Sequence, residues 1–211
     1  MKKIIISVFV AVLMMATGSF AVPAVGSGFG CLTTAKSHVQ GAGDLGFAIG
    51  LGDNATSFVG SLKYGLSAYT DGRIKIGMYD PDYGDAGFMV GGDFLYQMFS
   101  VAENPDRPFD MAPGGFFEYI DFEGGSVFEL GAQVIGSYDF EMDNGNIIAP
   151  YARFNLRMES ISADHGGSES ELKFGINGGV CFQVSELIKL YGEFQFDGND
   201  GVFFGLDYNV L

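Results

Sequence analysis

Basic residues are scarce in this sequence. The 211 residues contain 11 Lys and Arg against 26 Asp and Glu, which gives a formal net charge of -15 at pH 7. Because a nucleic-acid backbone is bound through a positively charged surface, this balance excludes nucleic acid as a partner. The simplest interpretation of the acidity is solubility and repulsion of other anions.

Constellations for catalysis or metal binding are also missing. The two histidines are His38 and His165, and His165 has an acid and a serine nearby, Asp164 and Ser168. These are ordinary loop residues, so a Ser-His-acid site is not expected. The carboxylates within residues 80–85 are typical of an acidic turn, because a calcium loop would need a Glu at its twelfth position. We therefore expect no enzymatic activity, no cofactor and no metal.

Long apolar runs are absent except near the start of the chain. Two lysines precede an apolar run over residues 4–15, and small residues follow it. The run is too short to cross roughly 30 Å of hydrocarbon, so the pattern indicates an export signal and not an anchor. We expect cleavage between Ala21 and Val22, which would remove residues 1–21.

The rest of the chain mixes apolar and polar residues finely. Hydrophobic residues make up 47% of the sequence and its mean hydropathy is +0.21. No later stretch approaches the roughly 18 consecutive apolar residues that indicate a membrane helix. Apolar content without long runs is typical of transmembrane β-strands, in which the two kinds of residue alternate. The 33 Gly, 21 Phe and 10 Tyr suit closely packed strands with aromatic residues at their lipid-facing ends.

Successive segments of the chain alternate apolar and polar residues with a period of two. In the segment 188–197, Leu190 and Phe194 fall on one face, and Lys189 and Glu193 fall on the other. The same alternation covers residues 73–78, 90–98, 127–140, 147–159 and 172–183. Less regular segments lie at 44–52, 56–67, 108–122 and 202–210. Together they predict an all-β fold of about ten strands, with about eight or about twelve as alternatives.

Short turn sequences separate these segments. Asn144-Gly145 and the run 198–201 contain residues that readily adopt positive φ. Consecutive strands with short connections run antiparallel, so we expect one up-and-down barrel over residues 42–211. Residues 22–41 form either a lead-in segment or an additional first strand. No linker marks a second domain.

In a membrane barrel the polar strand faces line the lumen and the apolar faces meet lipid. About ten strands leave little room for water, so we expect acidic and basic side chains to pair and to fill the lumen. An open, narrow charged pore is the alternative. The expected polar network consists of Lys63, Arg73, Lys75, Asp93, Glu129, Asp139, Arg153, Arg157, Glu159, Lys173, Lys189, Glu193 and Asp197.

The sequence contains two cysteines, Cys31 and Cys181. Export allows a disulfide between them, and two unpaired thiols are the alternative. Cys31 is not expected to carry a lipid, because no Leu stands three residues before it and it lies well past the apolar run.

The last residues of the chain place Gly205 ahead of the alternating positions Tyr208 and Val210. This end resembles the C-terminal assembly signal of outer-membrane proteins, with two departures. Phe203 stands where the family prefers a polar residue, and Leu211 stands where bacterial members usually have an aromatic residue. Over residues 42–211 the pattern resembles the small outer-membrane β-barrel proteins of Gram-negative bacteria, which include OmpA-type and OmpX-type barrels.

The resemblance implies an outer-membrane location, an even strand number and both chain ends in the periplasm. The connections at 80–85, 123–125, 162–168 and 198–201 would then lie outside the cell, and the turn at 185–187 in the periplasm. The implied partners are outer-membrane lipid, periplasmic chaperones and the barrel-assembly machinery, and the barrel would be a monomer.

These observations favour a membrane barrel with a structural or interaction role. One alternative is a narrow porin-like channel for small solutes. A second is a soluble exported barrel that binds an apolar ligand, which would carry its apolar side chains inside and its charges outside.

Overall fold

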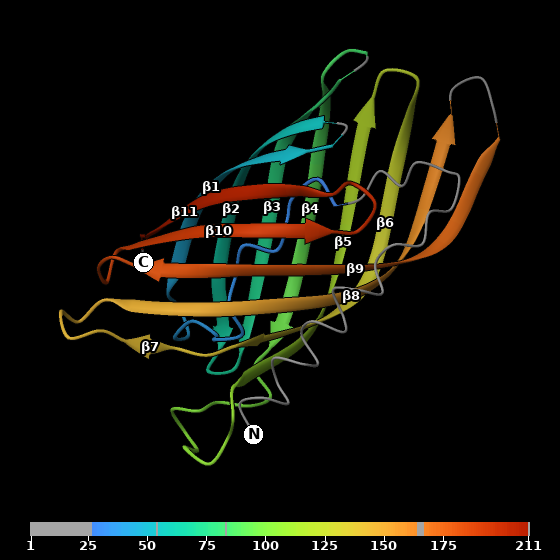
Figure 1. Cartoon of the computed structure of the whole chain (residues 1–211). Helices are drawn as coiled ribbons and strands as arrows, with labels where there is room; N and C mark the ends of the chain where they lie inside the picture. The colour runs from blue at the N-terminus through green and yellow to red at the C-terminus, as the bar shows by residue number, and fades with distance from the viewer. Residues whose placement is uncertain (1–26, 54, 83, 164–166, 211) are drawn as a thin grey trace.

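A computed structural model describes residues 27–53, 55–82, 84–163 and 167–210 (Figure 1). The predicted signal with its cleavage site at Ala21 and Val22 lies outside the described residues, as do His165 and Leu211. In this part of the chain no helix is long and apolar enough to cross a membrane.

The described chain is built from β-strands. Ten of them form the wall of a barrel, and an eleventh, β7, is a two-residue strand beside the start of β8. The strands are β1 (Gly43–Gly52), β2 (Ala55–Ser67), β3 (Thr70–Pro81), β4 (Gly87–Tyr96), β5 (Asp110–Phe122), β6 (Gly125–Ser137), β7 (Phe140–Glu141), β8 (Ile147–Ala163), β9 (Ser168–Gln183), β10 (Ile188–Phe196) and β11 (Gly201–Asn209).

Every wall strand pairs antiparallel with its neighbour in the chain. β1 also pairs with β11 over Asp44 to Gly52, and β6 pairs with β8 from Gly125 to Ser137, so the sheet closes on itself. Closure gives each wall strand a partner on both sides, which removes the exposed edges of an open sheet. The prediction of an all-β, up-and-down antiparallel barrel of about ten strands is confirmed.

The barrel has two ends that differ in their connections. We call the end where β1 begins and β11 finishes the near end; it carries the connections after β2, β4, β6 and β9. The opposite, far end carries those after β1, β3, β5, β8 and β10, which include all four connections expected to lie together outside the cell. β8 and β9 are the longest strands and extend beyond their neighbours at the far end (Figure 1).

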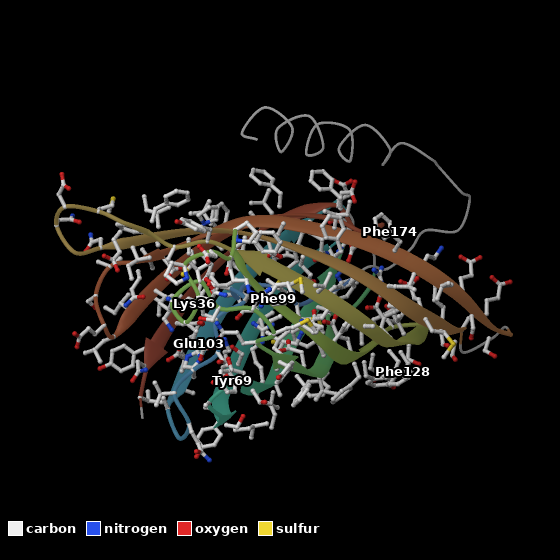
Figure 2. All side chains as sticks on the ribbon, turned by 90° about the horizontal axis from the view of Figure 1, so that it is seen from below. Lys36, Tyr69, Phe99, Glu103, Phe128 and Phe174 are labelled. Carbon is white, nitrogen blue, oxygen red and sulfur yellow. The ribbon has the colours of Figure 1, made fainter. Side chains whose placement is uncertain are left out.

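The longest near-end connection, 97–109, lies against the turn between β2 and β3. A hydrogen bond with the Glu103 carboxylate raises the pKa of Tyr69, because the nearby negative charge disfavours the phenolate. Figure 2 shows these two residues close to Phe99, whose ring stacks with Arg107 at 4.2 Å from its centroid. The connection is therefore an ordered part of the near end.

Alternation along the strands sends apolar side chains outward and polar ones inward. In β8, Leu156 and Met158 face outward, while Arg153 and Arg157 are buried inside. Large exposed hydrophobic residues lie on all ten wall strands, and Figure 2 shows Phe128 and Phe174 at the outside of the wall. An outer surface this apolar is costly in water and favourable in lipid.

The two consecutive residues Phe116 and Phe117 leave the alternation of β5 ambiguous in the sequence, and the structure resolves it. Phe116 points inward and Phe117 outward. The inward ring lies over the backbone of Gly131 on the neighbouring strand, where a Cβ atom would come within 2.6 Å of it. The guanidinium of Arg153 stacks on the same ring at 4.5 Å from the centroid. The inward position of Phe116 in β5 thus depends on Gly131 in β6 and on Arg153 in β8.

The outward face can be tested at Leu156, which lies midway along the part of β8 that pairs with β6. We expect Leu156→Arg to lower the free energy of unfolding by roughly 2–4 kcal/mol, because the charge would be held in hydrocarbon. Urea unfolding of the barrel from lipid vesicles measures this change. Val39→Arg is the control, because Val39 is exposed outside the strands and should leave stability unchanged. Equal behaviour of the two variants would contradict a lipid-facing wall.

Candidate functional site

The lumen of the barrel is occupied by the chain itself. Residues 27–41, which we call the plug segment, contain no strand and run from the far end to the near end inside the wall (Figure 1). At the far end Ser27 contacts Asp197 of the β10–β11 turn, and at the near end Lys36 pairs with Asp139 at 2.5 Å. The described part of the expected lead-in therefore lies inside the barrel and adds no strand.

Glu193 of β10 anchors the middle of the plug segment. Its two carboxylate oxygens accept the backbone N–H groups of Cys31 at 2.7 Å and Leu32 at 2.8 Å. Tyr151 and Asn177 donate to the same carboxylate at 2.7 and 2.8 Å. Four donors satisfy a charge that is almost fully buried, which makes the anchor both strong and directional.

Arg73 of β3 holds the same stretch of plug from the other side. Its guanidinium donates to the carbonyl oxygens of Cys31 at 2.7 Å and Leu32 at 3.2 Å. Asp93 of β4 accepts from Arg73 at 2.6 Å and so neutralises it. The plug backbone is thus fixed between an acidic and a basic side chain of opposite walls.

The far end of the plug segment is held at Ser27. Its backbone N–H donates to Asp197 at 3.0 Å and its hydroxyl to Glu118 at 2.8 Å. Gln195 donates to the Ser27 carbonyl at 2.8 Å, and Lys75 pairs with Glu118 at 2.9 Å. Backbone and side chain of one plug residue therefore engage three wall residues.

The near end of the plug segment is held at His38. Its Nε2 lies 2.6 Å from Asp44 and its Nδ1 3.4 Å from Asp71. The backbone N–H of His38 also donates to Asp71 at 2.9 Å. Lys189 pairs with Asp44 at 2.8 Å and Lys63 with Asp71 at 3.1 Å, so both carboxylates are neutralised by wall lysines.

A further ion cluster, which shares Asp197 with the Ser27 anchor, fills the side of the lumen formed by β6, β8 and the β10–β11 turn. Arg157 lies 3.0 Å from Glu129, 3.2 Å from Glu159 and 3.5 Å from Asp197. All four side chains are buried. Three acids around one arginine leave the cluster with an excess of negative charge, which Arg153 on the same strand moderates.

The structure brings most of the residues expected in the polar network into the lumen. Ten have buried side chains: Lys63, Arg73, Lys75, Asp93, Glu129, Arg153, Arg157, Glu159, Glu193 and Asp197. The remaining three lie at the rims, where Asp139 and Lys189 are at the near end and Lys173 is at the far end, paired with Glu171. The alternation of each strand was the signal that found them.

The sequence interpretation missed other parts of the site. Glu118, Asp44 and Asp71 belong to the same network but lie on the less regular strands or at strand ends. It also missed that the lumen contains apolar groups: Phe29 of the plug is buried, and the Lys75 ammonium lies 4.8 Å from its ring centroid. The lumen is therefore filled by the plug segment together with paired charges.

The cysteines are free thiols, which corrects the disulfide considered for Cys31 and Cys181. Cys31 belongs to the plug segment, and its thiol points toward the Thr33 carbonyl at 3.8 Å. Cys181 belongs to β9 and packs in the same apolar cluster without a covalent bond. Both thiols are buried and unbonded to each other, in agreement with the alternative of two unpaired thiols.

The C-terminal residues form β11, the strand that closes the barrel against β1. Tyr208 and Val210 point outward, and Gly205 faces the lumen, where Leu32 of the plug packs over it. Phe203 points inward against Gly30. The φ of 64° at Gly30 favours glycine, and a Cβ atom there would lie tightly, at 3.0 Å from the Phe203 ring. A role of this end in assembly stays a prediction.

Within the described residues no group of three or more His, Cys, Asp or Glu side chains is arranged to hold a metal ion. The acidic run 80–85 lies in the connection after β3 at the far end.

No known protein family matches this chain, and no curated protein matches it. Among solved structures it is similar to a barrel described as "De novo design of transmembrane beta-barrels", with 16% identity over 82% of this chain and 99% of that chain and a TM-score of 0.41. It is also similar to a KdgM porin, with 9% identity over 80% of this chain and 99% of that one and a TM-score of 0.38. A mutant Rh. blastica porin is 9% identical over 82% of this chain and 99% of the porin chain, with a TM-score of 0.18.

The closed strand order, the apolar outer face and the charged interior define this chain as a transmembrane β-barrel with the architecture of outer-membrane proteins. Its distinguishing feature is the plug segment. The finer resemblance to OmpA-type and OmpX-type barrels stays a prediction.

Thiol labelling tests the packing of the plug. Because both cysteines are buried, we expect a maleimide reagent to leave the native barrel unlabelled and to label both cysteines after unfolding without reductant. Mass spectrometry counts the labels. Failure of the unfolded, unreduced chain to react would reveal a disulfide, and rapid labelling of Cys31 in the native barrel would show that the plug is loose.

The Glu193 anchor can be tested by Glu193→Gln. The substitution removes the charge and turns an NH2 group toward a plug N–H. We therefore expect the free energy that holds the plug closed at Cys31 and Leu32 to fall by roughly 1.5–3 kcal/mol. The loss should appear as faster hydrogen exchange of the Cys31 and Leu32 amides. Glu169→Gln, on the exposed part of β9, is the matched control. Unchanged exchange in Glu193→Gln would show that the carboxylate does not hold the plug.

Proposed function

We propose that this protein is a small outer-membrane β-barrel of a Gram-negative bacterium with an occluded lumen and a structural or interaction role. The observation that carries the proposal is the path of residues 27–41 through the lumen, hydrogen-bonded to the wall on both sides. A conduit filled by its own backbone leaves no continuous water path for ions.

Burial of the charges supports the same conclusion. Arg153, Arg157 and Glu193 are each about as buried as core residues of a soluble protein, with 1% of their surface exposed. Charged groups that line an open pore keep contact with water, whereas these groups contact one another and the plug. The role we propose is therefore one of occupying and shaping the membrane, without catalysis.

A narrow channel for small solutes is the second candidate. The observation that favours it is that no disulfide ties the plug segment to the wall: hydrogen bonds, ion pairs and apolar packing hold it, and both thiols are free. Such contacts can exchange with water if the segment moves. In this case the form with the plug segment inside the lumen would be the resting, non-conducting state.

The reverse orientation expected of a soluble ligand-binding barrel finds no support. Exposed Phe, Leu and Ile side chains cover the outside, and the interior carries the charges and the plug.

Location and partners follow from the same proposal. Export by the signal at residues 1–21 would deliver the chain to the periplasm, where chaperones and the barrel-assembly machinery act. The C-terminal strand with Tyr208 and Val210 would be the assembly signal, and the near end would face the periplasm. Ser27, the first described residue, would then lie at the outer end of the lumen, which departs from the expectation that both chain ends lie in the periplasm. The barrel would be a monomer in outer-membrane lipid.

Planar-bilayer recording tests occlusion. We expect the intact barrel to show no steady ion-conducting steps, and a variant lacking residues 27–38 to show them, because its lumen would fill with water. Slower migration after boiling on a denaturing gel is the control that each protein is a folded barrel before it is recorded. Steady steps from the intact, folded barrel would overturn the occluded state in favour of the channel. Recovery of the protein in the aqueous periplasmic fraction would overturn the membrane location itself.

A further inference from the structure

The near end of the lumen contains a cavity of about 170 Å³ that the plug segment does not fill. It is bounded by the last part of the plug segment and by the near-end parts of β8, β9 and β10. The side chain of Lys36 is 42% exposed and that of Lys189 is 23% exposed, so the cavity reaches solvent at this end. The site lies away from the Glu193 and Arg157 clusters.

The polar wall of the cavity is basic in a strongly acidic protein. Lys36, Lys63 and Lys189 line it, and Asp139 is the one carboxylate that does so among the described residues. The carboxylates of Asp44 and Asp71, which pair with two of these lysines, lie behind them and outside the lining. The lining itself therefore contains more basic than acidic side chains, and each of its three lysines is paired with one carboxylate.

The lysines keep hydrogen-bonding capacity for a ligand. An ammonium group has three N–H donors. Among the described residues Lys36 makes one ion pair, with Asp139 at 2.5 Å. Lys189 pairs with Asp44 at 2.8 Å, and its ammonium lies 3.5 Å from Nε2 of His38. Their remaining donors are available to an oxyanion that enters between them.

Apolar side chains also line the cavity, on the wall that carries Lys189. Ile147 and Ala149 of β8 contribute aliphatic surface, and Tyr191 of β10, two residues from Lys189, contributes a ring. An engineered cavity of roughly 150 Å³ accepts a benzene ring, so the present volume accommodates a small ring or a short chain. A ligand for this cavity needs an apolar body and an anionic group at one side.

We propose that the near-end cavity is a binding site for a small organic carboxylate. The carboxylate lies between Lys36 and Lys189 with Lys63 behind, and the carbon skeleton packs against Ile147 and Tyr191. The ammonium groups in the lining provide charge-assisted hydrogen bonds, and the neighbouring apolar side chains distinguish an organic anion from an inorganic one. The site does not depend on whether the barrel conducts.

Isothermal titration of the folded, full-length mature barrel in detergent micelles with sodium benzoate tests the proposal. We expect saturable binding that weakens as sodium chloride is raised, because salt screens the lysine charges. Acetate and benzyl alcohol should each bind at least about tenfold more weakly, since one lacks the apolar body and the other lacks the charge.

Two single variants locate the site. Lys36→Gln should weaken benzoate binding about tenfold, because it removes a charge-assisted hydrogen bond. Lys173→Gln is the matched control, since Lys173 is also a partly exposed, acid-paired lysine but lies at the far end; it should bind benzoate as the unaltered chain does. If Lys36→Gln fails to fold, the salt dependence and the two comparison ligands in the unaltered barrel still decide the question.

Three results would overturn the proposal: no saturable benzoate binding, benzyl alcohol binding as tightly as benzoate, or equal weakening by Lys36→Gln and Lys173→Gln. These failures are distinct from failure of the membrane-barrel assignment, because the heat-modifiable band on a gel reports the folded barrel independently of any ligand.

Discussion

Charges that point into a narrow lumen must find partners there, and this requirement shapes the whole molecule. A ten-stranded wall with apolar residues outside has to direct its polar residues inward, where little water can reach them. Glu193 meets four donors and Arg73 meets two carbonyl oxygens and a carboxylate. The wall alone does not supply these partners, because the backbone of residues 27–41 provides a large share of them.

Wall and plug therefore form one structural unit. The anchors on Cys31, Leu32 and Ser27 use mainly backbone groups of the plug, so the wall specifies a path for the chain more than a particular plug sequence. Side-chain identity matters at a few points, such as Gly30, whose positive φ favours glycine and where a Cβ atom would contact the Phe203 ring tightly. Since the anchoring residues come from β3, β5 and β10, closure of the barrel and placement of the plug are coupled during folding.

Much of the wall could be predicted from the sequence, because a strand with one face in lipid and one in the lumen alternates visibly. Arg153 and Arg157 were identified in this way. The plug could not be predicted, since a segment whose backbone is recognised by distant side chains carries no periodicity of its own. The inward position of Phe116 was hidden for a related reason: it depends on Gly131 in another strand, which the local pattern of β5 does not reveal.

The distribution of basic residues connects the fold to its net charge. Outside the predicted signal, every Lys and Arg except Arg107 lies in the lumen, at one of its rims or in the plug segment. The connections and the outer ends of the strands are consequently acidic, and they repel anions over most of the surface. At the far end the single rim lysine, Lys173, is paired with Glu171 beside further carboxylates of β9. At the near-end cavity three lysines line a space that reaches solvent, each sharing its charge with one carboxylate. The pairing that fills the lumen therefore also sets where an anion would meet ammonium groups.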